Sequence, residues 1–189
     1  MRILIADDES LIRLGLRKML EEAGHEVIAA ARDGRTAVRL AHDLAPELAI
    51  LDVKMPGYDG LEAARRIVAE CPIPVILLTA YGQRDLVEQA TQAPIMAYLV
   101  KPVKESELLA SVEVAAARFA ERLKMAQEQA ELRESLDTRK VVERAKGLLI
   151  DRDGLSEEEA YRHIQTQARR QRRSMRAVAE EILRGAREN

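Results

Sequence analysis

Residues 1–9 read MRILIADDE, a short apolar run that ends directly in two aspartates. Four further apolar runs follow, and none alternates strictly with polar residues, which is typical of strands covered on both faces. The five runs are Ile3–Ala6, Val27–Ala30, Leu48–Leu51, Val75–Thr79 and Ala97–Val100. Helical patterns near residues 10–23, 35–44, 59–70 and 83–92 separate the runs and suit right-handed crossovers. The pattern predicts an α/β fold: a doubly wound, five-stranded parallel sheet built as (βα)5.

Polar side chains stand at the carboxyl ends of four of these runs. They are Asp7, Asp8, Asp52, Thr79 and Lys101. Each alone has an ordinary explanation as a helix cap, a turn residue or a solvated charge. In an open parallel sheet, however, side chains that leave the carboxyl ends of neighbouring strands converge on one crevice. Three carboxylates there repel one another unless a cation joins them, so the sequence predicts a metal-assisted phosphoryl site.

The residue types at these positions suit phosphoryl transfer. Magnesium prefers hard oxygen ligands, which Asp7, Asp8 and Asp52 supply. Asp52 can attack a phosphoryl group to form an acyl phosphate, while Lys101 places a cation against its oxygens and the Thr79 hydroxyl donates to them. Pro102 directly after the lysine predicts a cis peptide bond.

Length and composition favour a domain with a modest appendage. The chain has 189 residues, of which 33% are charged and 47% apolar, and no apolar stretch is long enough to cross a bilayer. The amino terminus shows no signal-peptide pattern, and the single cysteine, Cys71, excludes an internal disulfide and a cysteine-rich zinc site. We therefore expect a cytoplasmic protein without membrane contact.

The sign of the charge changes along the chain. Residues 1–112 carry 13 basic and 17 acidic side chains, whereas residues 139–189 carry 13 basic and 9 acidic ones. An acidic amino-terminal part and a basic carboxyl-terminal part are typical of a regulated domain joined to a domain that binds a polyanion.

A long helix is predicted to start near Glu105, because no glycine or proline interrupts the chain before Gly147. Within it, small and apolar residues at alternating steps of four and three form one seam: Val112, Ala116, Phe119, Leu123, Ala126 and Ala130. Two interpretations stay open, a rigid spacer that packs on its own domain and a coiled coil that forms a dimer. We expect the α/β domain to span residues 1–115, a helical linker to span 116–134 and an all-α three-helix domain to span 135–189.

The rear domain shows two further helix starts, at Ser156 and Ser174. The expected inward-facing residues of its helices are Val141, Val142, Ala145, Leu148, Leu149, Ala160, Tyr161, Ile164, Ala168, Ala177, Val178, Ile182 and Leu183. Basic residues are dense here, which suits phosphate contacts by helix-mounted cations. Our candidates for binding a nucleic acid are Lys140, Arg144, Lys146, Arg169, Arg170, Arg172, Arg173 and Arg176. The scarcity of aromatic residues argues against base stacking on a sheet.

The motifs LIADDE, LDVKMPGYDG, ILLTA and YLVKP make residues 1–120 resemble the receiver domain of two-component response regulators, the CheY-like fold. This resemblance implies that Asp52 is the phosphoacceptor, Asp7 and Asp8 are the acidic pair, and the backbone carbonyl of Lys54 is a third contact to Mg²⁺. It also implies that Thr79 and Tyr98 form a coupled switch. A sensor histidine kinase would be the phosphodonor, and the domain would catalyse its own phosphorylation and dephosphorylation without being an enzyme for an outside substrate.

The run RAKGLLIDRDGLSEEEAYRHIQTQA, followed by SMRAVAEEIL, resembles the ANTAR domain of AmiR- and NasT-type antitermination regulators. The resemblance implies binding of paired RNA hairpins in a nascent transcript. The leading hypothesis is thus a phosphorylation-controlled regulator that binds RNA, promotes antitermination and changes its dimerisation when phosphorylated. The alternatives are a DNA-binding regulator with a carboxyl-terminal helix-turn-helix and a protein-interaction output without nucleic acid.

Overall fold

The structure is a computed structural model that describes residues 1–80 and 95–185. The chain divides into two units, Met1–Leu123 and Lys124–Asn189, and each is considered by itself. The helix predicted near 83–92 lies outside the described residues.

The first unit contains the predicted parallel sheet. Its strands are β1 (Arg2–Ala6), β2 (Glu26–Ala31), β3 (Leu48–Asp52), β4 (Val75–Thr79) and β5 (Ile95–Val100). All neighbours pair in parallel, in the spatial order β2-β1-β3-β4-β5. The reversal of strand order beside β1 marks a topological switch point, where crevices for ligands form in sheets of this kind.

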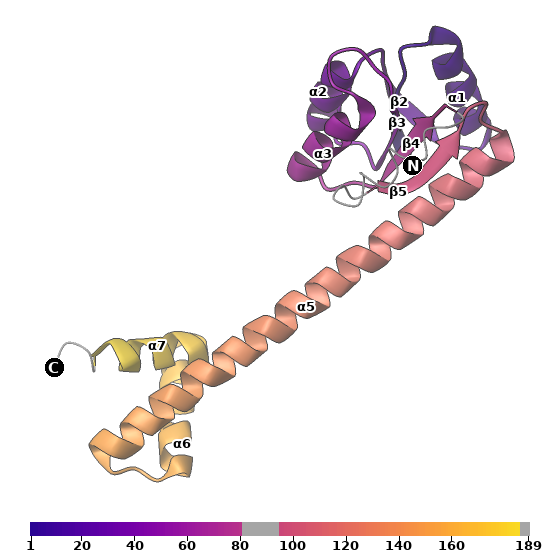
Figure 1. Ribbon diagram of the computed structural model, residues 1–189. Coiled ribbons are helices and arrows are strands. Elements are labelled where there is room, and N and C mark those ends of the chain that lie inside the picture. Colours follow the sequence, from indigo (N-terminus) through magenta and orange to yellow (C-terminus); the bar gives the residue numbers. More distant parts are fainter. Residues whose placement is uncertain (81–94, 186–189) are drawn as a thin grey trace. The chain divides into compact units, whose positions relative to one another are not determined.

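Helices cover both faces of the sheet (Figure 1). They are α1 (Ser10–Glu22), α2 (Gly34–Leu44), α3 (Gly60–Glu70) and the first turns of α5 (Glu105–Asp153). In β3, Leu48 and Ile50 join one core with α1 and α5, and Ala49 and Leu51 join the other with α2 and α3. Because both sets of side chains are buried, the strand is a continuous apolar run rather than an alternating one.

Helix ends in the first unit follow local chemistry. Asp33 and Asp59 cap α2 and α3 by accepting hydrogen bonds from the backbone N–H groups of Thr36 and Glu62, both at 2.8 Å. By contrast, α1 has no side-chain cap, and its N-cap position is Glu9. Asp8 is therefore not used as a helix cap.

The long helix α5 is continuous over 49 residues, as predicted. Val112 on this helix is fully buried in the core of the first unit, so the first position of the predicted seam packs on its own domain. Every residue from 120 to 137 is exposed. Within the described ranges no helix, α5 included, combines the length and apolar character needed to cross a membrane.

The second unit is the predicted arrangement of three helices, in which the end of α5 packs against α6 (Glu157–Gln171) and α7 (Met175–Gly185). Its buried core consists of Val142, Ala145, Leu149, Ala160, Ile164, Ala168, Val178 and Ala179. Ser156 forms a capping box with Glu159, and Ser174 accepts a hydrogen bond from the N–H of Ala177. The expectation that Tyr161 faces inward is wrong: its side chain is 43% exposed, because Ala160 and Ile164 fill the inner face of α6.

Candidate functional site

Strand register gathers the predicted site residues at one edge of the sheet. Ala6 of β1 pairs with Leu51 of β3, so Asp7 and Asp52 are next to each other at the ends of adjacent strands. On the other side, Thr79 pairs with Val100, and the Thr79 carbonyl accepts a hydrogen bond of 2.8 Å from the N–H of Lys101. Residues that lie up to 94 positions apart in sequence thus surround one crevice.

Three carboxylates form the centre of the site. Asp7, Asp8 and Asp52 each offer an oxygen atom, and these oxygens lie within 4.8 Å of one another. Asp7 is fully buried and Asp52 is 5% exposed, whereas Asp8 is open to solvent. The buried Oδ2 of Asp7 has the ammonium group of Lys101 at 2.7 Å. A set of hard, partly open carboxylate oxygens fits Mg²⁺.

Lys101 reaches over the carboxylates from the end of β5, and its peptide bond to Pro102 is cis, as predicted. Its Nζ lies 2.7 Å from Asp7 Oδ2 and 3.0 Å from Asp52 Oδ1. Burial by itself would lower the pKa of the ammonium group, but the two carboxylates outweigh it and raise the pKa. Lys101 is therefore a fixed cation beside the carboxylates of Asp7 and Asp52.

Asp52 stands in an environment that resists its ionisation. Burial raises the pKa of its carboxyl group, Lys101 opposes that rise, and the nearby Asp7 and Asp8 charges add to it. A divalent cation shared by these carboxylates would lower the pKa again, since it would cancel the repulsion among them. The geometry thus couples the charge on Asp52 to cation binding.

The other residues predicted for this site, Thr79, Tyr98 and Lys54, differ in their exposure to solvent. Thr79 is 6% exposed at the end of β4, and Tyr98 is half-buried in β5 opposite Leu77. Burial raises the pKa of the Tyr98 hydroxyl. Lys54 follows Asp52 by two residues with its side chain in solvent.

Two residues near the acidic pair escaped the sequence analysis. Arg13 in α1 donates through Nη1 to the backbone carbonyls of Asp7 and Asp8, at 2.7 and 3.0 Å. Glu9 donates its N–H to Asp7 Oδ1 at 2.9 Å, and its carboxylate lies 3.8 Å from Lys101 Nζ. Hydrogen bonds to backbone groups do not depend on the type of residue that accepts them, so the sequence shows only that an arginine lies one turn into the helix.

The loop after Asp52 is held by close packing. A Cβ atom at Gly60 would lie 2.2 Å from the backbone oxygen of Asp52, so only glycine allows α3 to start so near Asp52. The ring of Tyr58 in the loop contacts two guanidinium groups, with the Cζ of Arg66 4.4 Å and that of Arg35 5.2 Å from the ring centroid. These contacts position the segment that carries Lys54.

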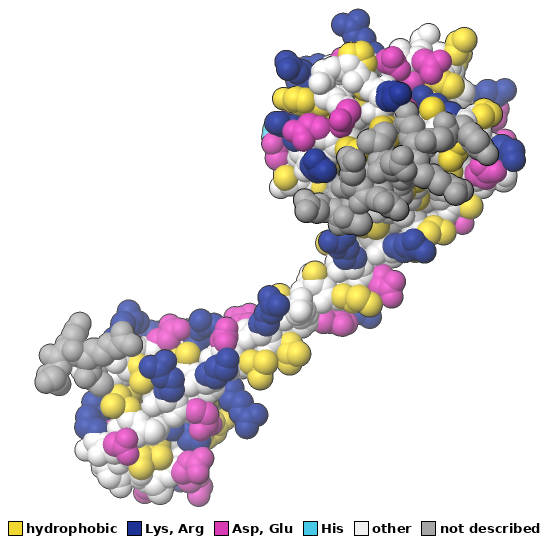
Figure 2. All heavy atoms as spheres, viewed as in Figure 1, with side chains coloured by type: hydrophobic (Ala, Val, Ile, Leu, Met, Phe, Trp, Pro, Cys, Tyr) yellow, Lys and Arg dark blue, Asp and Glu magenta, His cyan; other side chains and the backbone are white. Residues whose placement is uncertain are grey.

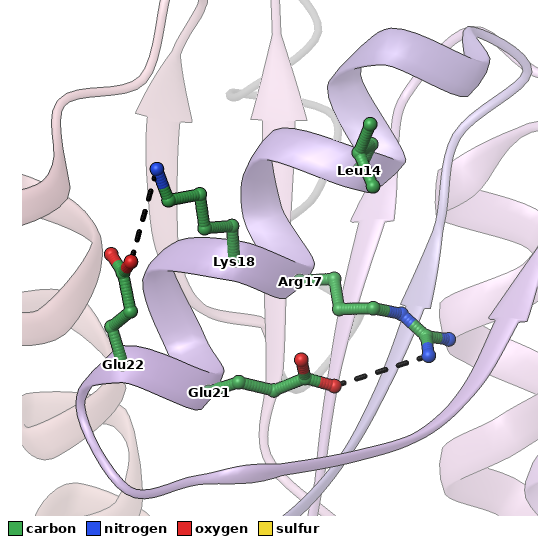
Figure 3. Close-up of a pocket in the computed structure, with 5 residues that line it drawn as sticks. All are labelled: Leu14, Arg17, Lys18, Glu21 and Glu22. Atoms are coloured by element: carbon green, nitrogen blue, oxygen red, sulfur yellow. Dashed lines mark ion pairs between the residues drawn. The ribbon is translucent and has the colours of Figure 1, made fainter.

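A hollow on the outer surface of α1 is separate from this chemistry (Figure 3). Its charged side chains pair with each other along the helix, Arg17 with Glu21 at 3.9 Å and Lys18 with Glu22 at 3.8 Å. Leu14 at its edge is 65% exposed, and Leu11, nearer the acidic pair in sequence, is 80% exposed. The hollow has no convergent polar groups, but the two leucines leave an apolar patch beside the site.

Basic side chains are spread over the second unit, with acidic ones between them (Figure 2). Arg144, Arg169, Arg170 and Arg172 are exposed and form no ion pair with any described residue. The other exposed or half-buried candidates have acidic neighbours: Lys140 has Asp137 at 3.8 Å, Arg176 has Glu180 at 2.9 Å, and Arg173 pairs with Glu181.

Lys146 differs from the other basic candidates because its side chain is only 8% exposed. Its Nζ lies 2.8 Å from Glu157 Oε1 and 3.0 Å from Glu143 Oε2, and these two carboxylates raise its pKa. The ammonium group thereby links α5 to the first turn of α6. A direct contact of Lys146 with RNA would have to displace both carboxylates.

Comparison with known families finds two matches. The response regulator receiver domain matches residues 3–113, and the ANTAR domain matches residues 130–183. Together these matches include all the residues of the acidic site and of the three-helix core described above.

Individual relatives agree with this division. The transcriptional regulatory protein PdtaR of Mycobacterium tuberculosis is 49% identical over 182 residues, which cover 96% of this chain and 89% of that protein. The transcriptional regulatory protein LiaR of Bacillus subtilis is 37% identical over 116 residues, or 60% of this chain. Among solved structures, the signal receiver domain of the putative response regulator NarL from Mycobacterium tuberculosis matches with a TM-score of 0.58 and 32% identity, over 61% of this chain and 95% of that one.

Proposed function

Because the chain belongs to the response regulators and joins a receiver domain to an ANTAR domain, we propose that it is a phosphorylation-controlled regulator that binds RNA hairpins. Its binding to a nascent transcript promotes transcription antitermination. The observation that supports control by phosphorylation is the buried carboxylate of Asp52, which lies beside Lys101 and the acidic pair. A regulator that acts on nascent transcripts works where they are made, and we therefore place it in the cytoplasm.

In the proposed reaction, a carboxylate oxygen of Asp52 attacks the phosphorus atom of the donor, and the bond to the leaving group breaks. The product is an acyl phosphate on Asp52. Lys101 neutralises charge on the transferred oxygens, and the Thr79 hydroxyl donates a hydrogen bond to one of them. The receiver supplies these groups itself, so it catalyses its own phosphorylation and, with water as the acceptor, its own dephosphorylation.

Asp7, Asp8, Asp52 and the carbonyl of Lys54 would hold a Mg²⁺ ion in this site. When bound, the ion supplies charge that offsets the repulsion between carboxylates and phosphoryl oxygens. The support for this proposal is the carboxylate cluster itself, whose three oxygens lie within 4.8 Å of one another.

Magnesium is expected to stabilise the wild-type protein but not Asp8→Asn. At a free Mg²⁺ concentration ten times Kd, the free energy of unfolding should rise by about 1.4 kcal/mol. Asp8→Asn removes one charged ligand while leaving both Lys101 ion pairs in place, so this gain should largely disappear. Thermal unfolding followed by circular dichroism, with and without MgCl₂, measures the difference. Asp43→Asn is the control, because this exposed carboxylate is outside the cluster. An undiminished response in Asp8→Asn would contradict the assigned site.

A sensor histidine kinase is the proposed phosphodonor. A kinase must bring its phosphohistidine to Asp52, and the exposed Leu11 and Leu14 offer an apolar surface on the helix that starts beside the acidic pair. Figure 3 shows Leu14 on the outer side of α1, where a partner helix can reach it.

We further propose that phosphorylation shifts the side chains of Thr79 and Tyr98 and that this shift, transmitted through β5, promotes dimerisation along α5. In the dimer, the exposed stretch from 120 to 137 packs against the same stretch of a second copy of the chain. Met125, Leu132 and Leu136 are 50 to 62% exposed and follow one another at steps of seven and four, the spacing of a coiled-coil seam. This seam is displaced by one residue from the one predicted from the sequence, which contains Ala126 and Ala130. A dimer would present two RNA-binding units to a ligand with two hairpins, which raises the effective concentration of the second contact.

The RNA-binding surface is proposed to include the seven basic candidates other than Lys146, whose pairing with Glu157 and Glu143 makes it a residue that positions α6. We propose that Arg169, Arg170 and Arg172 make the main contacts with RNA. They are exposed near the end of α6 and, within the described part of the chain, have no acidic partner to displace. Arginine suits a phosphate backbone because its planar fork donates two parallel hydrogen bonds.

Phosphorylated wild-type protein is expected to prefer two-hairpin RNA to duplex DNA at every salt concentration tested. Arg169→Ala should weaken RNA binding by about tenfold and lower the slope of log K against log salt by about one. Filter binding in Mg²⁺ and acetyl phosphate measures both, with Arg65→Ala, an exposed arginine of α3, as the control. A preference for duplex DNA would favour the helix-turn-helix alternative, and binding of neither would favour a protein-interaction output.

A further inference from the structure

A groove runs along the side of α6 that flanks the face packed in the three-helix core. It has a volume of about 410 Å³, and its wall at the α5–α6 turn is the partly buried Leu155. The side chains that define this α6 groove are polar: Arg162, His163, Thr166, Gln167 and Arg170. Of these, only Arg170 is among the basic candidates for nucleic-acid binding named from the sequence.

The middle of the α6 groove presents both donors and acceptors of hydrogen bonds. Thr166 offers a hydroxyl, and Gln167 offers an amide that neighbouring side chains orient. Gln167 Oε1 accepts a hydrogen bond of 2.8 Å from Gln171, and its Nε2 lies 3.4 Å from His163 Nε2. An amide held in this way suits the edge of a nucleobase, which carries donors and acceptors side by side. A carboxylate or phosphate would use the donors alone.

Charge in the α6 groove favours an anionic ligand. Glu159, the acidic lining residue, is engaged by Ser156 in the capping box, through contacts with both the hydroxyl and the N–H group. Arg162 pairs with Glu158 on the same helix. Arg170, at the other end of the groove, has no ion pair among the described residues and is exposed to solvent. One free guanidinium group beside neutral hydrogen-bonding groups matches a nucleotide, which has one phosphate and one base.

We propose that the α6 groove binds an unpaired nucleotide from the loop of an RNA hairpin. Gln167 and Thr166 hydrogen-bond the base, and Arg170 contacts the adjacent phosphate. His163 is the aromatic side chain among the lining residues, and the hydrogen bonds that distinguish one base from another come from Gln167 and Thr166. This proposal rests on the proposed RNA-binding function and adds to it a site that reads the loop sequence, distinct from arginines that contact the backbone.

The test uses the full-length chain, treated with Mg²⁺ and acetyl phosphate, and a pool of two-hairpin RNAs with randomised loops. Wild-type protein is expected to enrich particular loop sequences. Gln167→Ala should bind the unselected pool as wild type does, yet lose about tenfold of the preference for enriched loops. Gln165→Ala is the matched control: the same substitution two residues away on the same helix, at a half-buried glutamine that does not line the groove. Alanine preserves helix propensity in both variants.

A second pair of variants separates base reading from backbone contact. Thr166→Val, which removes the hydroxyl and keeps the shape, should also reduce the preference for enriched loops. Arg170→Ala should instead weaken the binding of enriched and unselected RNA alike. If Gln167→Ala and Thr166→Val retain the full wild-type preference, the groove proposal is overturned while RNA binding stands. If the wild-type protein neither binds nor enriches any RNA in the pool, the proposed function fails as well.

Discussion

Asp52→Asn is expected to lose phosphorylation by acetyl phosphate, with a fall in rate of roughly three orders of magnitude or more. The amide keeps the size of the carboxylate but lacks the negative oxygen that attacks phosphorus. Lys101 would remain near Asp7, at 2.7 Å, so the surroundings of the site should persist. Intact-mass spectrometry after incubation with Mg²⁺ and acetyl phosphate measures the bound phosphate. Sedimentation velocity on the same samples shows whether the phosphate-dependent change in assembly disappears with it.

Asp43→Asn provides the control for this experiment, because it makes the same chemical change at an exposed carboxylate of α2. This variant should gain phosphate and change its assembly as the wild type does. If Asp52→Asn still acquired phosphate, the nucleophile would have to be another residue. If it failed to acquire phosphate but still assembled in response to acetyl phosphate, dimerisation would not depend on the acyl phosphate.

Gly60→Ala is expected to destabilise the protein strongly, with a loss of about 3 kcal/mol in the free energy of unfolding. The added Cβ would lie 2.2 Å from the backbone oxygen of Asp52 and 2.9 Å from the Cα of Val53. Backbone atoms cannot rotate away as a flexible side chain does, so α3 or the end of β3 must move. Since a displacement of about 1 Å can reduce the rate a hundredfold, phosphorylation of Asp52 should fall by up to about that factor.

Gly15→Ala is the matched control, since it places the same methyl group in the middle of α1, where nothing lies within 4 Å of the new Cβ. This change should raise the free energy of unfolding by about 0.5–1 kcal/mol, because alanine favours a helix over glycine. Urea unfolding of both variants measures the contrast. Equal stability of Gly60→Ala and wild type would show that α3 does not need to approach Asp52 so closely.

The sheet could be predicted in detail because its information is local. Strands buried on both faces must be apolar throughout, so β3 and β4 are visible as short runs without reference to their neighbours. The cap at Ser156 is equally local, because Glu159 is three residues away. The convergence of Asp7 and Asp52 follows from topology, since parallel strands end at the same edge.

Features that depend on distant neighbours were predicted less well. Tyr161 has an apolar ring on a helix whose inner face is already filled by alanines and Ile164, and the spacing alone did not exclude it. Lys146 lies in a basic motif, yet Glu157, eleven residues away across a turn, holds its ammonium group.

By itself the sequence determined the parallel sheet, the acidic edge with Asp52 and Lys101, and the three-helix rear unit, because hydrophobic period and chain direction decide all three. Only the tertiary structure decided which groups meet: Arg13 with the carbonyls of the acidic pair, Gly60 with the backbone of Asp52, and Lys146 with two glutamates. The physical reason is range. Periodicity records which way a side chain faces, whereas hydrogen bonds and steric contacts depend on atoms that a different element brings within a few ångströms.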